Sequence, residues 1–150
     1  MEKAADIQKH IRDLFRSQNL AVLATQNNDQ PYASLIAFVA TEDLNFLYFV
    51  TPKTTRKFAN LTANARVALL INSSTNQATD FHQAIAVTAV GEAEEITGAD
   101  REQVLSLYLA KHPYLEEFAQ SPTCALMRVT ARSYYLVKNF QKVLEFHLTP

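Results

Sequence analysis

Cysteine and glycine are scarce in this chain. It contains one cysteine, Cys124, and two glycines, Gly91 and Gly98. A single cysteine excludes a disulfide framework, a CxxC redox pair and a thiolate site for zinc or an iron–sulfur cluster. Two glycines exclude the glycine-rich loops of dinucleotide-binding and Walker-type sites, where the backbone must approach phosphate closely. If the protein binds a phosphate, it must therefore do so with side chains and a helix end.

Charge of one sign and long apolar runs are also missing. The formal net charge is −1 over 150 residues, of which 48% are hydrophobic. A general nucleic-acid binder would carry a wide basic face, and a membrane span would need about 20 consecutive apolar residues. The N-terminal segment alternates charged and apolar residues and has no signal-peptide core. These features predict one globular, cytoplasmic domain over residues 1–150, without nucleic-acid or membrane partners.

Hydrophobic periodicity predicts a few helices among many short strands. We expect helices at 3–17, 55–63 and 99–119, the last broken at Pro113, and a polar loop at 74–83. We expect strands at 20–25, 31–41, 44–50, 65–73, 84–96, 124–132, 133–137 and 142–148. Thr97 and Asp100 suit a capped start of the third helix, and Gly91 suits a bend in its strand. So many strands in a short chain predict an α+β fold that is mainly antiparallel β and favours a barrel.

One short segment, residues 51–57, concentrates positive charge and hydroxyl groups. Its cations are Lys53, Arg56 and Lys57, and its hydroxyl-bearing residues are Thr51, Thr54 and Thr55. The segment leads into a predicted helix, whose N-terminus has free N–H groups and a positive dipole end. Thr54 and Thr55 can cap this end, but cations in a first turn are unfavourable unless an anion completes the site. The residues alone leave two interpretations open: a phosphate-type anion site, or an ordinary capped helix with solvated cations.

The segment LYFVTPKTTRKFANLTANARVALLI, residues 47–71, resembles the FMN-binding split-barrel family that includes pyridoxamine 5′-phosphate oxidase. In that family, a strand ends in an aromatic-rich stretch and Thr, and Ser/Thr-Arg-Lys then opens a short helix before an apolar strand. The resemblance extends over residues 20–96. It implies a six-stranded FMN-binding split barrel with flanking helices. It also implies a homodimer with FMN at the two-fold interface, so that part of each site comes from the partner chain.

The resemblance implies an FMN site with a phosphate end and a ring end. Arg56 and Lys57 would bind the phosphate, with Thr55 in support. The residues beside the isoalloxazine ring or the ribityl chain would be Ser34, Leu35, Ile36, Val50, Thr51 and Gln83. Of these, Gln83 would hydrogen-bond the ring, and the residues of strand 31–41 would contact the flavin mostly through their backbone.

Several features depart from pyridoxamine 5′-phosphate oxidase itself. That enzyme's C-terminal tryptophan, arginine and histidine have no counterpart in this chain, which has no Trp. A helical insert at 99–119 lies in the region where the oxidase places its substrate-binding residues. The family's second phosphate-binding arginine is replaced in this chain, near Ala33 and Ser34. We therefore expect an FMN-dependent oxidoreductase that acts on another substrate. The alternative is a flavin- or haem-binding protein without turnover, for stress response or haem utilisation.

The four histidines show no metal-ligand spacing, and no Ser-His-Asp or Cys-His arrangement can be argued from the sequence. We therefore predict no metal site, and the catalytic residues stay unassigned. His147 is the candidate iron ligand if the protein binds haem. The residues do not decide between FMN, a deazaflavin and haem, or whether the protein turns over.

Overall fold

The computed structural model describes residues 3–148. Its helices are α1 (Ala4–Ser17), α2 (Arg56–Ala63), α3 (Asp80–Gln83), α4 (Arg101–Lys111), the 3-10 turn η1 (Pro113–Leu115) and α5 (Glu116–Gln120). Its strands are β1 (Leu20–Asn27), β2 (Gln30–Ala40), β3 (Phe46–Pro52), β4 (Arg66–Asn72), β5 (Ala86–Glu95), β6 (Cys124–Lys138) and β7 (Lys142–His147). None of the described helices is long and apolar enough to cross a membrane.

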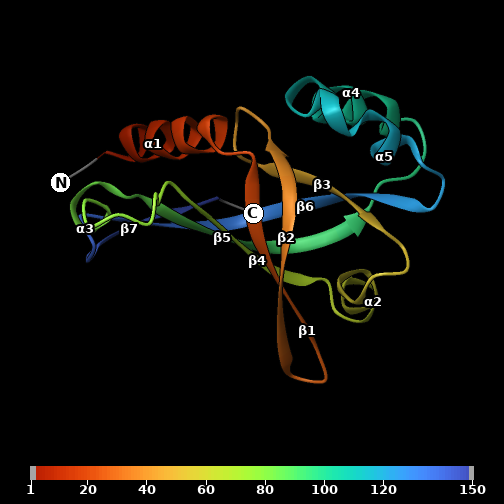
Figure 1. The fold of residues 1–150 in the computed structure, drawn as a ribbon, viewed down its shortest axis with the longest axis horizontal. Helices are drawn as coiled ribbons and strands as arrows, with labels where there is room; N and C mark the ends of the chain where they lie inside the picture. The colour runs from red at the N-terminus through yellow and green to blue at the C-terminus, as the bar shows by residue number, and fades with distance from the viewer. Residues whose placement is uncertain (1–2, 149–150) are drawn as a thin grey trace.

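The strands form a closed barrel with one additional strand. They follow the order β3-β2-β1-β4-β5-β6-β7, and β3 also pairs with β6. This last pairing closes six antiparallel strands into a barrel and leaves β7 attached to β6 alone. Figure 1 shows α1, α4 and α5 on one side of the strands and α2 on the other. The predicted α+β fold, a six-stranded split barrel with flanking helices, is confirmed.

Strand β6 joins the barrel to β7 because it changes partner half-way along its length. Residues from Cys124 to Thr130 pair with β3, and residues from Ser133 to Lys138 pair with β7. The other edge of β6 pairs with β5. The prediction of two separate strands at 124–132 and 133–137 is therefore wrong, because one strand of 15 residues runs through both.

At Gly91, where the sequence predicts a bend of its strand, the structure has a β-bulge whose extra residue lies on β6. The register between β5 and β6 shifts between Val90 and Gly91, so that Arg132 has no partner on β5. A Cβ atom at Gly91 would lie 2.2 Å from the carbonyl oxygen of Thr130. Only glycine permits this close approach of the two backbones.

Two apolar clusters organise the interior. The first fills the barrel and is closed by the buried face of α1, which consists of Ile7, Ile11, Leu14 and Phe15. The second lies outside the barrel, where α4 buries Val104, Leu105 and Tyr108 against Val39, Tyr48 and Val50 of β2 and β3. The helical insert therefore covers the outer surface of β2 and β3.

Side chains of α4 and the residue after it attach the insert to β2. The Tyr108 hydroxyl donates a hydrogen bond to the carbonyl of Ala37 at 3.1 Å, and His112 Nε2 lies 2.7 Å from the carbonyl of Phe38. Strand β2 leaves β1 and begins to pair with β3 at this point. The insert thus supplies polar partners to backbone carbonyls where the ladder changes.

Two local predictions were incomplete or wrong. The predicted loop at 74–83 ends in the short helix α3. The Asp80 carboxylate accepts hydrogen bonds from the backbone N–H groups of Thr75 at 3.0 Å and Asn76 at 2.8 Å. These bonds, led by that from Thr75, lower the pKa of Asp80.

The predicted cap at Asp100 is absent, since its carboxylate makes no cap hydrogen bond.

Candidate functional site

The predicted phosphate-binding segment connects β3 to α2 through the hydroxyl groups of Thr51 and Thr55. Thr51 is fully buried, and its Oγ1 lies 3.0 Å from Oγ1 of Thr55. Thr55 Oγ1 accepts a hydrogen bond from the backbone N–H of Phe58 at 3.2 Å. The helix cap predicted at Thr55 is confirmed, whereas Thr54 is exposed. These contacts hold the first turn of α2 in a defined position at the end of β3.

The cations of this segment have different environments. Lys53 Nζ lies 3.6 Å from a carboxylate oxygen of Glu95. Arg56 and Lys57 form no ion pair with any residue from 3 to 148, and the first turn of α2 contains no acidic residue. The Arg56 guanidinium lies over the ring of Tyr32, 5.7 Å from its centroid. Two uncompensated cations thus stand at the positive end of the helix dipole, where an anion can bind.

The three candidate residues on β2 point in alternate directions. Ile36 is buried in the barrel core with 4% of its surface exposed, whereas Leu35 is 60% exposed on the outer face. The Ser34 hydroxyl oxygen is buried and has no hydrogen-bond partner among the described residues. Because an unpaired buried hydroxyl is unfavourable, Ser34 fits a site that supplies a polar ligand atom. Ile36 can contact such a ligand only through its backbone.

Val50 and Thr51 have little exposed surface within the chain. Val50 is 5% exposed and belongs to the cluster under α4, and Thr51 is 0% exposed. Their side chains support the end of β3 from within the fold. In one chain, they are not available for direct side-chain contact with a ligand on the surface.

Gln83 lies far from the cations of α2. It is the last residue of α3, which follows the end of β4, whereas α2 precedes the start of β4. The seven residues of β4 span about 20 Å of extended chain. Figure 1 shows α2 and α3 toward opposite ends of the molecule. A single chain therefore does not bring Gln83 together with Arg56 and Lys57.

An apolar row crosses the outer face of the sheet between these two regions. Strand register places Leu35, Val22, Leu70, Thr88 and Tyr135 side by side across β2, β1, β4, β5 and β6. Leu35 is 60% exposed and Leu70 is 38% exposed.

Sequence reasoning missed this row and the contact between Tyr32 and Arg56. The signal for the row was the continuous apolar run LAVLAT at 20–25, which lacks the polar outward positions of a sheet that faces water. Tyr32 carried no comparable signal, because only the fold brings β2 next to α2.

A sequence model of the family described as pyridoxamine 5′-phosphate oxidase matches residues 7–138. The chain belongs to the pyridoxamine 5′-phosphate oxidase family. The family resemblance seen in residues 47–71 is thereby confirmed, and the match includes the α2 segment and the apolar row. A comparison with curated proteins found no match.

Solved structures share the fold at low sequence identity. The structure of a haem-binding protein from Mycobacterium smegmatis has a TM-score of 0.82 and 15% identity, covering 98% of this chain and 59% of that protein. ChuZ from Campylobacter jejuni has a TM-score of 0.82 and 14% identity, covering 98% and 61%. An FAD-binding protein from Mesorhizobium loti has a TM-score of 0.68 and 14% identity, covering 85% and 91%. The chain therefore spans about three-fifths of the first two proteins, and these likenesses concern the fold alone.

Proposed function

We propose that this member of the pyridoxamine 5′-phosphate oxidase family binds FMN through the first turn of α2 and acts as an FMN-dependent oxidoreductase. The observation that carries the proposal is the pair of cations Arg56 and Lys57, which have no carboxylate partner among the described residues. A phosphate at this turn would accept charge-assisted hydrogen bonds from both side chains and from free backbone N–H groups. It would also neutralise two charges that the helix dipole disfavours.

Other residues fit the remainder of the cofactor. Thr55 orients the first turn of α2 through its cap and its contact with Thr51. The buried Ser34 hydroxyl can donate a hydrogen bond to a polar atom of the ligand. Leu35 points to the other face of β2 and can contact the same ligand only through its backbone. A bound flavin would supply the hydride chemistry, and the protein would supply phosphate anchoring and orientation.

We propose that the functional unit is a homodimer. The apolar row that contains Leu35 and Leu70 has no cover among the described residues, and a second copy would bury it. Association through this face would also give the site of one chain access to the partner's Gln83. The expected hydrogen bond to the flavin ring would then come from a different chain than the phosphate contacts.

Titration of the purified apoprotein with FMN tests the site. The Arg56→Ala and Lys57→Ala variants should each bind FMN about 10- to 100-fold more weakly, the loss expected for a charge-assisted hydrogen bond. Lys53→Ala is the matched control, because Lys53 belongs to the same segment but is paired with Glu95. Equal affinities in the wild type and both variants would refute the phosphate site.

A second experiment tests the reaction. The FMN-loaded protein should oxidise NADH or NADPH in multiple turnovers, and the Lys57→Ala variant should lose this activity at FMN concentrations that saturate only the wild type. The protein could bind FMN through Arg56 and Lys57 and yet oxidise neither donor. That result would contradict the oxidoreductase activity but not the FMN site.

Haem binding without turnover is the second candidate. It is supported by the fold shared with the haem-binding protein from M. smegmatis and by the position of His147. His147 lines a hollow of about 740 Å³ between β3 and β7. Its ring nitrogens contact Ser133 at 2.6 Å and Glu145 at 2.8 Å, so one contact must break before the ring can bind iron. A Soret band after haem addition that disappears in His147→Ala would favour this candidate, and haem binding unchanged in that variant would exclude His147 as the ligand.

A further inference from the structure

A second cavity lies away from α2, between α1, the turn after β2, and α4. Its volume is about 290 Å³, at the small end of ligand pockets. Its apolar wall includes Phe15 of α1, Val39 and Leu44 beside the turn, and Leu107 of α4. Figure 1 shows α1 and α4 on the side of the barrel opposite to α2. The cavity is therefore separate from the proposed FMN site.

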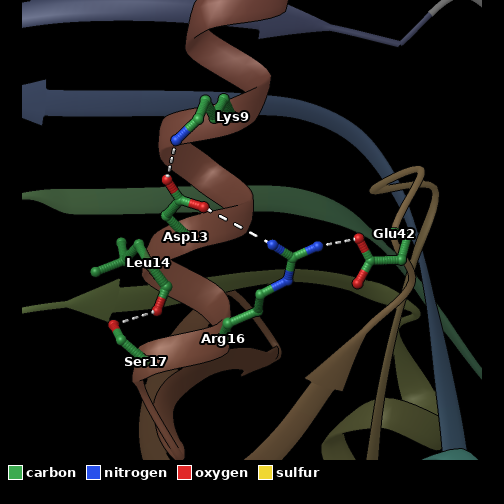
Figure 2. A network of polar contacts seen from close by, with 6 residues as sticks. All are labelled: Lys9, Asp13, Leu14, Arg16, Ser17 and Glu42. Carbon is green, nitrogen blue, oxygen red and sulfur yellow. Dashed lines mark hydrogen bonds and ion pairs between the residues drawn. The ribbon is translucent and has the colours of Figure 1, made fainter.

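The charged residues that line this cavity are unevenly compensated. Arg16 of α1 forms an ion pair with Glu42 on the turn after β2 through its Nη2 atom (Figure 2). Its Nη1 atom lies 3.8 Å from Oδ1 of Asp13. Arg12, half-buried one turn earlier, forms no ion pair with a described residue. Arg16 is thus neutralised by two carboxylates, whereas Arg12 is not.

Lys111 is the other uncompensated cation of the cavity. Its Nζ donates a hydrogen bond to the carbonyl of Phe15 at 2.8 Å and lies 4.0 Å from the centroid of the Phe38 ring. Both partners are neutral. Burial lowers the pKa of Lys111 to about 8, because a desolvated ammonium lacks a counter-charge.

We propose that this cavity binds a small amphipathic carboxylate, with its apolar body against Phe15, Leu44 and Leu107 and its carboxylate between Arg12 and Lys111. Two cations from different helices face one small space whose remaining wall is largely apolar. A carboxylate supplies the missing negative charge, and a short hydrocarbon body fills the apolar part. A doubly charged phosphate without such a body would leave the apolar wall without a contact.

Sodium octanoate is a suitable probe. Two control compounds each carry one of its features: 1-octanol has the apolar chain without the charge, and inorganic phosphate has negative charge without the chain. Isothermal titration of the full chain at pH 7 should detect octanoate binding. Arg12→Gln should weaken that binding by about tenfold, as expected for a charge-assisted hydrogen bond. Lys9→Gln is the matched control, because Lys9 is an exposed cation of the same helix that is paired with Asp13 (Figure 2) and does not line the cavity. It should bind octanoate as the wild type does.

The pH dependence tests the role of Lys111. Octanoate affinity should fall as the pH rises through about 8, since the neutral amine no longer attracts the carboxylate. The other charged groups that line the cavity are Arg12, Arg16 and Glu42, and the lowered pKa of His112, the residue after Lys111, keeps its ring neutral in this range. Lys111→Met should bind octanoate weakly at every pH, and if that variant does not fold, Arg12→Gln still decides the case. Any of three results would overturn the proposal: octanoate does not bind the wild type, it binds Arg12→Gln as tightly as the wild type, or it binds the wild type no more tightly than 1-octanol and phosphate do.

Discussion

The ammonium group of Lys53 lies 3.6 Å from the carboxylate of Glu95, at the end of β5. Lys53 therefore differs from the other cations of its segment in having a carboxylate partner. Arg56 and Lys57, only a few residues later, have no carboxylate partner among residues 3–148. The segment therefore contains one cation that belongs to the fold and two that are available to a ligand.

Replacing Lys57 by glutamate should stabilise the apoprotein and abolish FMN binding. A carboxylate in the first turn of a helix is favourable by about 0.3–1 kcal/mol, whereas it would repel the phosphate. Urea unfolding of the apoprotein and a fluorescence titration with FMN measure the two effects. Lys53→Glu is the control and should not stabilise the protein, because it places a second carboxylate beside Glu95. If Lys57→Glu destabilises the apoprotein as much as this control, the cation is not unfavourable at its position.

Replacing Thr55 by alanine should destabilise the protein by about 1 kcal/mol, because α2 loses its N-cap. The Thr51 hydroxyl also loses its contact with Thr55. Thr55→Ser should retain most of the stability, since serine caps a helix equally well. The exposed Thr54 provides the matched substitution, and Thr54→Ala should change the free energy of unfolding by less than about 0.5 kcal/mol. Equal effects of the two alanine substitutions would contradict the cap.

Charged substitutions in the apolar row should dissociate the proposed homodimer. Leu35→Asp and Leu70→Asp would each bury a carboxylate in an apolar interface. Sedimentation velocity should show a dimer for the wild type and a monomer for both variants, and FMN affinity should fall together with dimer content. Tyr114→Asp serves as the control, because Tyr114 is 99% exposed and is not part of the apolar row. A wild type that is monomeric at high concentration would exclude this interface.

The free energy of unfolding should rise between pH 7.5 and 9.5 through a contribution from Lys111. Its pKa is about 8 in the folded protein against 10.5 in the unfolded chain, so above about pH 8 the unfolded chain binds more protons. Stability then increases with pH, as proton linkage requires. Denaturant unfolding at several pH values, compared with Lys111→Met, isolates this contribution. If the wild type and the variant show the same slope against pH, Lys111 does not have a depressed pKa.

Much of this protein could be predicted from the sequence because the signals are local. Apolar spacing on α1 identified the helix and its buried face, and the two residues between β1 and β2, Asn28 and Asp29, have the positive φ angles of a tight hairpin turn. The cap at Thr55 and the cations of α2 follow from residues within one turn. The family could be inferred from residues 47–71 because that segment contains the whole strand–helix–strand unit.

Other features depend on residues that are far apart in the chain. Nothing near Lys53 predicts its pairing with Glu95. The continuity of β6 through its bulge depends on the close approach of Gly91 to Thr130. The apolar row and the cavity between α1 and α4 likewise exist only after register and packing are set.

The family, the barrel, and the cap and cations at the start of α2 are evident from the order of the amino acids, since periodicity, capping and charge act over a few neighbouring residues. Which cations lack a counter-charge, and which apolar side chains remain exposed, follows only from the folded chain. Both properties depend on the neighbours that strand pairing and helix packing bring together.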